Sequence, residues 1–125
     1  MLDGPARYPY QAPIDAYGNG GVRFADMSHK GSILCLPSGI HAWEVTTAEA
    51  IDIAALAAVL AERDRLRFLL LGTGRMQVFP SRDVRKAFEA AGLGLEPMDT
   101  GAACRTYNVL LAERRPVAAA LIAVD

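Results

Sequence analysis

The stretch FLLLG at residues 68–72 decides the fold class. All but its closing glycine are large apolar residues, so neither face of the segment is suited to contact with water. A short run of this kind is typical of a central strand that is covered on both faces, as in α/β sheets. A second run, VAAALIAV at residues 117–124, closes the chain. The two runs predict two buried strands of one sheet.

Three amphipathic segments surround these strands and are predicted to be helices. Their apolar residues recur at three- and four-residue spacing. The first is expected from a cap at Thr47 to about Arg63. The second and third are expected at residues 82–91 and 100–115, capped by Ser81 and by Asp99 or Thr100, with Pro116 preventing continuation of the third.

The N-terminal third has the pattern of antiparallel strands with short connections, at residues 14–17, 22–27, 33–37 and 40–45. Residues 1–13 contain three prolines and no periodicity, which predicts an extended arm before a single domain at residues 14–125. A further short strand is predicted at residues 95–98. The sequence therefore predicts a compact α/β domain with a mixed sheet, its antiparallel strands first and strands alternating with helices after them.

Composition excludes several classes of protein. The chain has 125 residues, is 52% hydrophobic and carries a net charge of −1, without the surplus of Lys and Arg expected of a nucleic-acid binder. Its apolar runs are too short to span a bilayer, and the N-terminus lacks the apolar core of a signal peptide. Cys35 and Cys104 form no CxxC motif and no cluster with histidine, which predicts free thiols in a reducing cytoplasm and neither metal nor cofactor.

Four motifs together resemble one small domain family. They are IDAYGNGGVRF at 14–24, HKGSILCLPSG at 29–39 followed by Trp43, LLLGTG at 69–74, and MDTGAACRTYNVLLAERRPVAAAL at 98–121. This family holds bacterial and archaeal proteins of unknown activity and a mitochondrial assembly factor of respiratory complex I. The resemblance implies a three-layer α/β fold with a mixed central sheet. It also implies a role in building a membrane complex from the soluble side, and it implies no reaction.

Cys104 is the candidate nucleophile. In the first turn of a helix, beside Arg105, a thiol is expected to have a lowered pKa. A base would have to come from elsewhere, and His29 in the predicted turn SHKGS is the candidate. The alternative is a buried cysteine that packs as a small apolar residue, and the sequence favours this structural interpretation.

A ligand or partner site is predicted where two segments are expected to meet. The loop Gly72, Thr73 and Gly74 follows a strand at the end where α/β sheets bind ligands, although it matches neither a dinucleotide nor a Walker motif. It would form a pocket if it faced the helix start from Thr100 to Arg105. Arg105 and Asn108 then either hold an anion or make structural contacts, with Asp99 or Asp26 as the expected partner of Arg105.

Two hypotheses follow from the sequence. The first is a cytoplasmic interaction or assembly module that docks on a protein partner, such as a subunit of a membrane complex, without inserting into the membrane itself. The second is a small-molecule or anion-binding enzyme that uses the same cleft, with Cys104 as its nucleophile. A free strand edge would also allow a homodimer.

Overall fold

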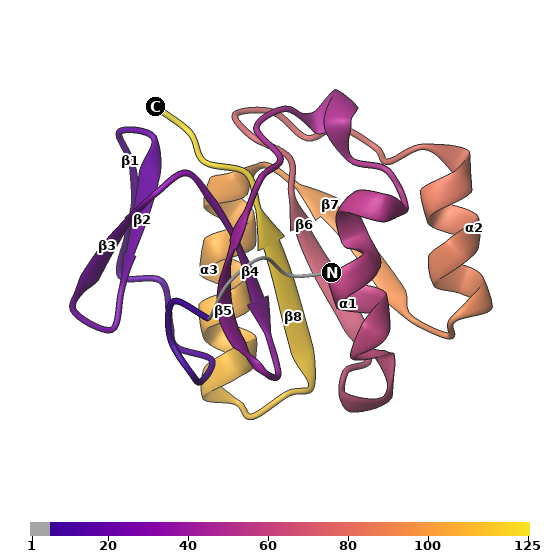
Figure 1. Cartoon of the computed structure of the whole chain (residues 1–125), viewed down its shortest axis with the longest axis horizontal. Coiled ribbons are helices and arrows are strands. Elements are labelled where there is room, and N and C mark those ends of the chain that lie inside the picture. The colour runs from indigo at the N-terminus through magenta and orange to yellow at the C-terminus, as the bar shows by residue number, and fades with distance from the viewer. Residues whose placement is uncertain (1–5) are drawn as a thin grey trace.

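The computed structural model describes residues 6–125. Its strands form two sheets (Figure 1). The smaller sheet is antiparallel, in the order β1-β2-β3, with β1 at Ala16–Gly18, β2 at Gly21–Phe24 and β3 at Met27–Lys30. The larger sheet has the order β5-β4-β8-β6-β7, with β4 at Ser32–Leu36, β5 at Gly39–Trp43, β6 at Phe68–Gly72, β7 at Gly94–Met98 and β8 at Val117–Leu121.

The two apolar runs lie at the centre of the larger sheet, as predicted. β8 pairs in parallel with β6, where Leu70 lies opposite Ala119, and antiparallel with β4, where Cys35 lies opposite Ala119. β6 pairs in parallel with β7 on its other side. The sheet is therefore mixed, and the predicted fold class is confirmed.

Three layers result from the alternation of side chains along these strands (Figure 1). Leu69 and Leu71 point into a core beneath α1 (Ala57–Ala61) and α2 (Arg82–Ala90). Leu70 points into a second core, which the smaller sheet and α3 (Thr100–Ala112) cover. The strand FLLLG is apolar on both faces because each face has its own core.

The prediction of one helix from Thr47 to about Arg63 is wrong. Only α1 is α-helical in this region, flanked by 3-10 turns at Ala48–Ala50, Ala54–Leu56 and Arg63–Arg65, and Thr47 makes no capping hydrogen bond. The Asp52 carboxylate accepts the N–H of Ala55 at 2.7 Å, and the Trp43 indole donates to the Ala55 carbonyl at 2.9 Å. The Asp52 bond is an N-terminal cap of the turns that follow it, so the helical segment begins after Asp52 and not at Thr47.

The other helix starts are as predicted. Ser81 caps α2 by accepting the N–H of Val84, and Asp99 caps α3 by accepting the N–H of Ala102. Part of the predicted arm pairs with β5, since Tyr8 forms a bridge with Ile40, whereas residues 1–5 lie outside the described part of the chain. Within residues 6–125, no helix combines the length and hydropathy needed to cross a bilayer.

Candidate functional site

The loop at residues 72–74 and the start of α3 do meet, and hydrogen bonds join them directly. The Thr100 hydroxyl accepts the N–H of Gly74 at 2.9 Å and donates to the Ile122 carbonyl at 2.7 Å. The Thr100 N–H donates to the Gly74 carbonyl at 2.8 Å. Thr100 is fully buried, so this junction joins β6, α3 and the end of β8 and leaves its polar groups satisfied.

Thr73 has a similar structural role on the other side of the loop. Its buried hydroxyl lies 2.6 Å from the Met76 carbonyl oxygen and accepts the N–H of Val78 at 3.0 Å. It also lies 3.1 Å from the carbonyl oxygen of Met98 on β7. The loop is therefore held by its own hydrogen bonds, which use the groups that would otherwise bind a ligand.

Cys104 lies in the apolar core between α3 and the larger sheet, with 2% of its surface exposed. Burial raises the pKa of its thiol to about 12, because the nearby Arg105 guanidinium offsets only part of the desolvation. This direction is opposite to the one expected for a helix start. Among the described residues, no hydrogen bond connects His29 to Cys104, and the His29 ring lies 3.2 Å from the Ser32 carbonyl oxygen instead.

We predict that both thiols react slowly in the folded protein. Burial also raises the pKa of Cys35 to about 12, from 9.0, which reduces the thiolate fraction at neutral pH roughly a thousandfold. Iodoacetamide should therefore label the native chain at least about a hundredfold more slowly than the urea-unfolded chain. Rapid labelling of Cys104 in the native state, located by peptide mass spectrometry, would contradict this and favour the enzyme hypothesis.

Asn108 and Arg105 contact different parts of the N-terminal third. The Asn108 side chain accepts the N–H of Ile14 at 2.7 Å and donates to the Ile14 carbonyl at 2.8 Å, so it holds the chain before β1. Arg105 donates to the Tyr17 hydroxyl at 3.1 Å and pairs with neither Asp99 nor Asp26.

Gly101 allows this approach of Tyr17 to α3. A Cβ atom at Gly101 would lie 2.5 Å from the Tyr17 hydroxyl oxygen and 3.3 Å from the Arg105 guanidinium. The bare backbone at this position therefore leaves room for the tyrosine. Tyr17 and Arg105 connect the smaller sheet to the first turns of α3.

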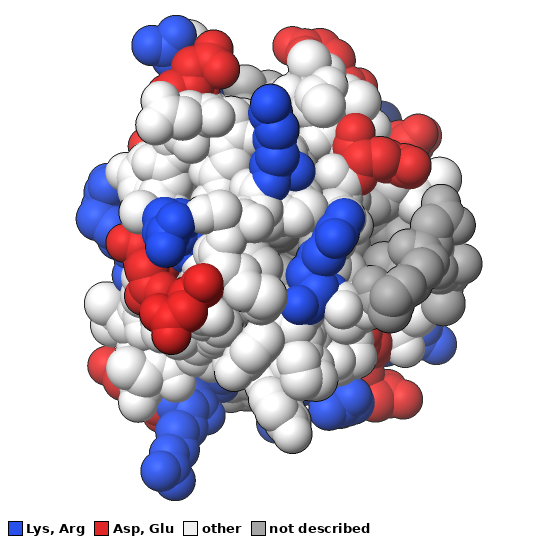
Figure 2. Space-filling model, turned by 60° about the vertical axis from the view of Figure 1, so that its left-hand side comes forward, with Lys and Arg blue, Asp and Glu red and all other residues white. Residues whose placement is uncertain are grey.

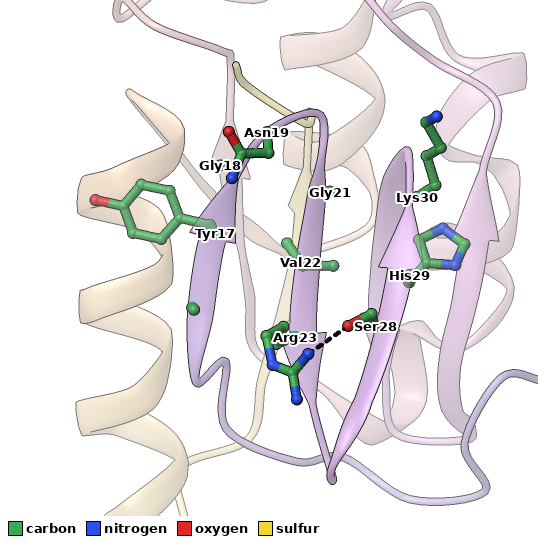
Figure 3. Close-up of a pocket in the computed structure, with 10 residues that line it drawn as sticks. Tyr17, Gly18, Asn19, Gly21, Val22, Arg23, Ser28, His29 and Lys30 are labelled. Carbon is green, nitrogen blue, oxygen red and sulfur yellow. Dashed lines mark hydrogen bonds between the residues drawn. The ribbon is translucent and has the colours of Figure 1, made fainter.

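A pocket of about 350 Å³ lies on the smaller sheet (Figure 3). We call it the sheet pocket; its lining residues are Ala16, Tyr17, Gly18, Asn19, Gly21, Val22, Arg23, Ser28, His29 and Lys30. The register pairs Gly21 with Gly18 and Lys30, and Arg23 with Ala16 and Ser28, which places these six residues on the outer face. Tyr17, Val22 and His29 belong to the opposite, inner face. The outer face is hollowed because two glycines and an alanine occupy three of its six positions.

Two cations border the sheet pocket without an acidic neighbour in its lining. Figure 3 shows Arg23 near one end of the strands, donating to the Ser28 hydroxyl at 2.6 Å, and Lys30 near the other end. Within residues 6–125 the ion pairs are Arg65–Glu62 and Arg115–Glu113, so neither cation is neutralised by a carboxylate. Figure 2 shows this side of the molecule, where Lys or Arg side chains stand within uncharged surface. The sheet pocket is therefore suited to a negatively charged group.

Sequence reasoning did not identify Arg23 and Lys30 as site residues. The glycine cluster of YGNGGVRF and the following SHKG segment contain the signal, because a hairpin places alternate residues on one face. The pairing register is needed to know that both cations share a face with Gly21.

The two histidines predict a loss of stability on mild acidification. Burial lowers the pKa of His29 and of His41 below 6.5, so the unfolded chain takes up protons first as the pH falls. This part of the free energy of unfolding is fully present above the unfolded pKa of 6.5 and decreases below it. Urea titrations at about pH 7 and about pH 5.5 should show the decrease, and the variant His29→Gln/His41→Gln should flatten it. A pH slope unchanged in that variant would show that other groups cause it.

Comparisons with a protein-family model and with individual proteins identify relatives of this chain. Residues 14–122 match a family model described as a protein of unknown function (DUF498/DUF598). An uncharacterised protein of Rhodobacter capsulatus is 38% identical over 110 residues, which cover 88% of this chain and 83% of the relative. The NADH dehydrogenase [ubiquinone] 1 alpha subcomplex assembly factor 3 of Xenopus tropicalis is 30% identical over 87% of this chain, which spans 60% of the frog protein's length.

A solved structure agrees with this fold over nearly its full length. The crystal structure described as an outer membrane protein from Bartonella henselae superposes with a TM-score of 0.92 at 48% sequence identity. The match covers 95% of this chain and 100% of the Bartonella chain.

Proposed function

We propose that the chain, which belongs to the DUF498/DUF598 family of proteins of unknown function, is a docking module that binds an acidic segment of a protein partner in the sheet pocket. The observation that carries the proposal is a concave pocket with two unpaired cations and no carboxylate in its lining. Tyr17 also lines the sheet pocket and has 41% of its surface accessible, although its side chain belongs to the inner face and its hydroxyl accepts a hydrogen bond from Arg105. Aromatic and arginine side chains of this kind frequently dominate protein interfaces.

A binding role is favoured over catalysis by the chemistry of the site. Both thiols are buried with raised pKa values, and His29 is bonded to the backbone at the pocket rather than to a nucleophile. Nucleophilic catalysis needs a nucleophile within hydrogen-bond reach of a base. Among the residues that line the sheet pocket, no nucleophile is paired with a base. Binding of an acidic segment needs only complementary charge, which Arg23 and Lys30 supply.

The partner we propose is a subunit of a respiratory membrane complex, bound from the cytoplasmic side. Support comes from the frog relative, whose name describes an assembly factor of NADH dehydrogenase. Two further similar proteins are described by membrane terms, the outer membrane protein of Bartonella henselae and the 13 kDa major membrane protein of Francisella tularensis. Of these names, that of the frog relative refers to assembly and the other two refer to a membrane.

The test is to identify what the protein binds at native expression level. The tagged chain is purified from gently solubilised cells, and co-purifying proteins are identified by mass spectrometry. We expect respiratory-complex subunits with the native chain and their loss with Arg23→Glu/Lys30→Glu. The matched control is Arg67→Glu/Arg114→Glu, which changes the net charge equally at exposed positions away from the sheet pocket. Recovery of the same subunits with the pocket variant would overturn the proposal.

A further inference from the structure

A second exposed surface lies on the segment between β6 and α2. Met76 is 74% exposed, Phe79 is 72% exposed and Val78 is 40% exposed. In Figure 1 this segment runs along the upper rim of the molecule, away from the smaller sheet. Large apolar side chains scattered singly on a surface are ordinary, but three within four residues form a patch that calls for a partner.

Hydrogen bonds hold this segment in place. The buried Thr73 hydroxyl contacts the Met76 carbonyl and the Val78 N–H, and the Gln77 side chain donates to the Pro97 carbonyl at 3.0 Å. The bonds fix the backbone on either side of Met76 and tie it to β7. The exposed apolar side chains therefore project from a loop whose backbone is fixed by hydrogen bonds.

Positive charge is concentrated beside these side chains. Residues 75–86 contain four basic side chains, Arg75, Arg82, Arg85 and Lys86, and one acid, Asp83, all of them exposed. This stretch therefore carries +3, whereas the whole chain carries −1 and the remaining residues carry −4. The acids that follow in the chain are the exposed Glu89, one turn after Lys86 on α2, the exposed Glu96 on β7, and Asp99, which caps α3. The net charge of the chain conceals this local excess.

We propose that residues 75–86 bind the surface of a membrane that contains anionic lipid, with Met76, Val78 and Phe79 entering the interface and the flanking cations contacting phosphate groups. Side chains this exposed stand out from the surface and do not line a groove, so they fit a fluid interface that needs no complementary shape. The neighbouring cations supply the attraction to anionic headgroups. Binding of this kind is peripheral and needs no membrane-spanning helix.

The first experiment measures binding of the full chain to vesicles. Vesicles of equimolar phosphatidylcholine and phosphatidylglycerol should sediment the protein, and vesicles of phosphatidylcholine alone should not. Met76→Ser/Phe79→Ser should weaken binding at least about tenfold. The matched control Val109→Ser removes another exposed apolar side chain, 57% accessible on α3, and should change binding less than about twofold.

A second measurement distinguishes insertion of the apolar side chains from purely electrostatic adsorption of the protein. Phe79→Trp should show a blue-shifted tryptophan emission on anionic vesicles, and Val109→Trp should not. The native Trp43 is buried and bonded to Ala55, so it supplies a constant background. Failure to bind anionic vesicles, or binding that is equal in the double serine variant, overturns the proposal. An unshifted Phe79→Trp spectrum in a sample that sediments also overturns it.

Discussion

Replacing Thr100 with valine should lower the free energy of unfolding by about 2–4 kcal/mol, the largest stability effect we expect from a near-isosteric change. Valine keeps the branched shape but removes the hydroxyl that accepts from Gly74 and donates to Ile122. Thr100 is fully buried, so water cannot replace either bond. Two backbone groups would be left without partners where β6, α3 and the end of β8 meet. Urea denaturation, followed by the fluorescence of Trp43, measures the change.

The conservative variant distinguishes the hydrogen bonds from packing. Thr100→Ser retains the hydroxyl and removes one methyl group, which should reduce the free energy of unfolding by only about 1 kcal/mol. If valine and serine were equally destabilising, the methyl group rather than the hydroxyl would be what matters at this junction. The variant also tests the interpretation of the Gly72–Gly74 loop, since a ligand-binding role would place the main loss in binding and leave stability unchanged.

Reversing both cations of the sheet pocket should weaken partner binding at least about a hundredfold. Arg23→Glu/Lys30→Glu replaces attraction to an acidic segment by repulsion at both ends of the sheet pocket. The fold should remain intact, because both side chains are exposed and only the Arg23–Ser28 hydrogen bond is lost. The affinity of the native chain for the identified partner should also fall as salt is added, since exposed charges are screened. Titration of the purified partner, monitored by calorimetry, measures both effects.

A control variant distinguishes the effect of the position of the charges from the effect of the total charge. Arg67→Glu/Arg114→Glu lowers the net charge by the same amount and should leave the affinity within about twofold of native. An equal loss of affinity in both double variants would mean that the partner responds to overall charge. The sheet pocket would then have no special part in recognition.

The central strands of the larger sheet were predictable because short segments of sequence determine them. The runs FLLLG and VAAAL are apolar on both faces, and only a doubly covered strand satisfies such a run. The caps at Ser81 and Asp99 were predictable for the same reason, since each side chain bonds to a backbone group three residues away. The region from residue 47 to residue 63 was not, because Asp52 and not Thr47 makes the capping bond, and the Trp43 indole bonds to the Ala55 carbonyl from the neighbouring strand β5.

The sheet pocket depends on contacts that no local pattern reveals. Arg23 and Lys30 share a face only in the observed register of β2 and β3. Tyr17 reaches Arg105 across 88 residues of sequence, through space left by Gly101. The sequence indicated Arg105 and His29 as candidate residues. It could not predict where their side chains point or that Cys104 is buried, because tertiary packing determines both.

Site-specific photo-crosslinking tests whether the sheet pocket binds an acidic segment of a protein partner. A benzoylphenylalanine placed at Ser28, on the outer face of the smaller sheet, should yield an adduct with an acidic segment of a respiratory-complex subunit in living cells. The same group at Ala112, exposed at the end of α3, should yield none. Adducts of that subunit at Ala112 but not at Ser28, or no protein adduct at either position, would contradict the docking role proposed for the sheet pocket.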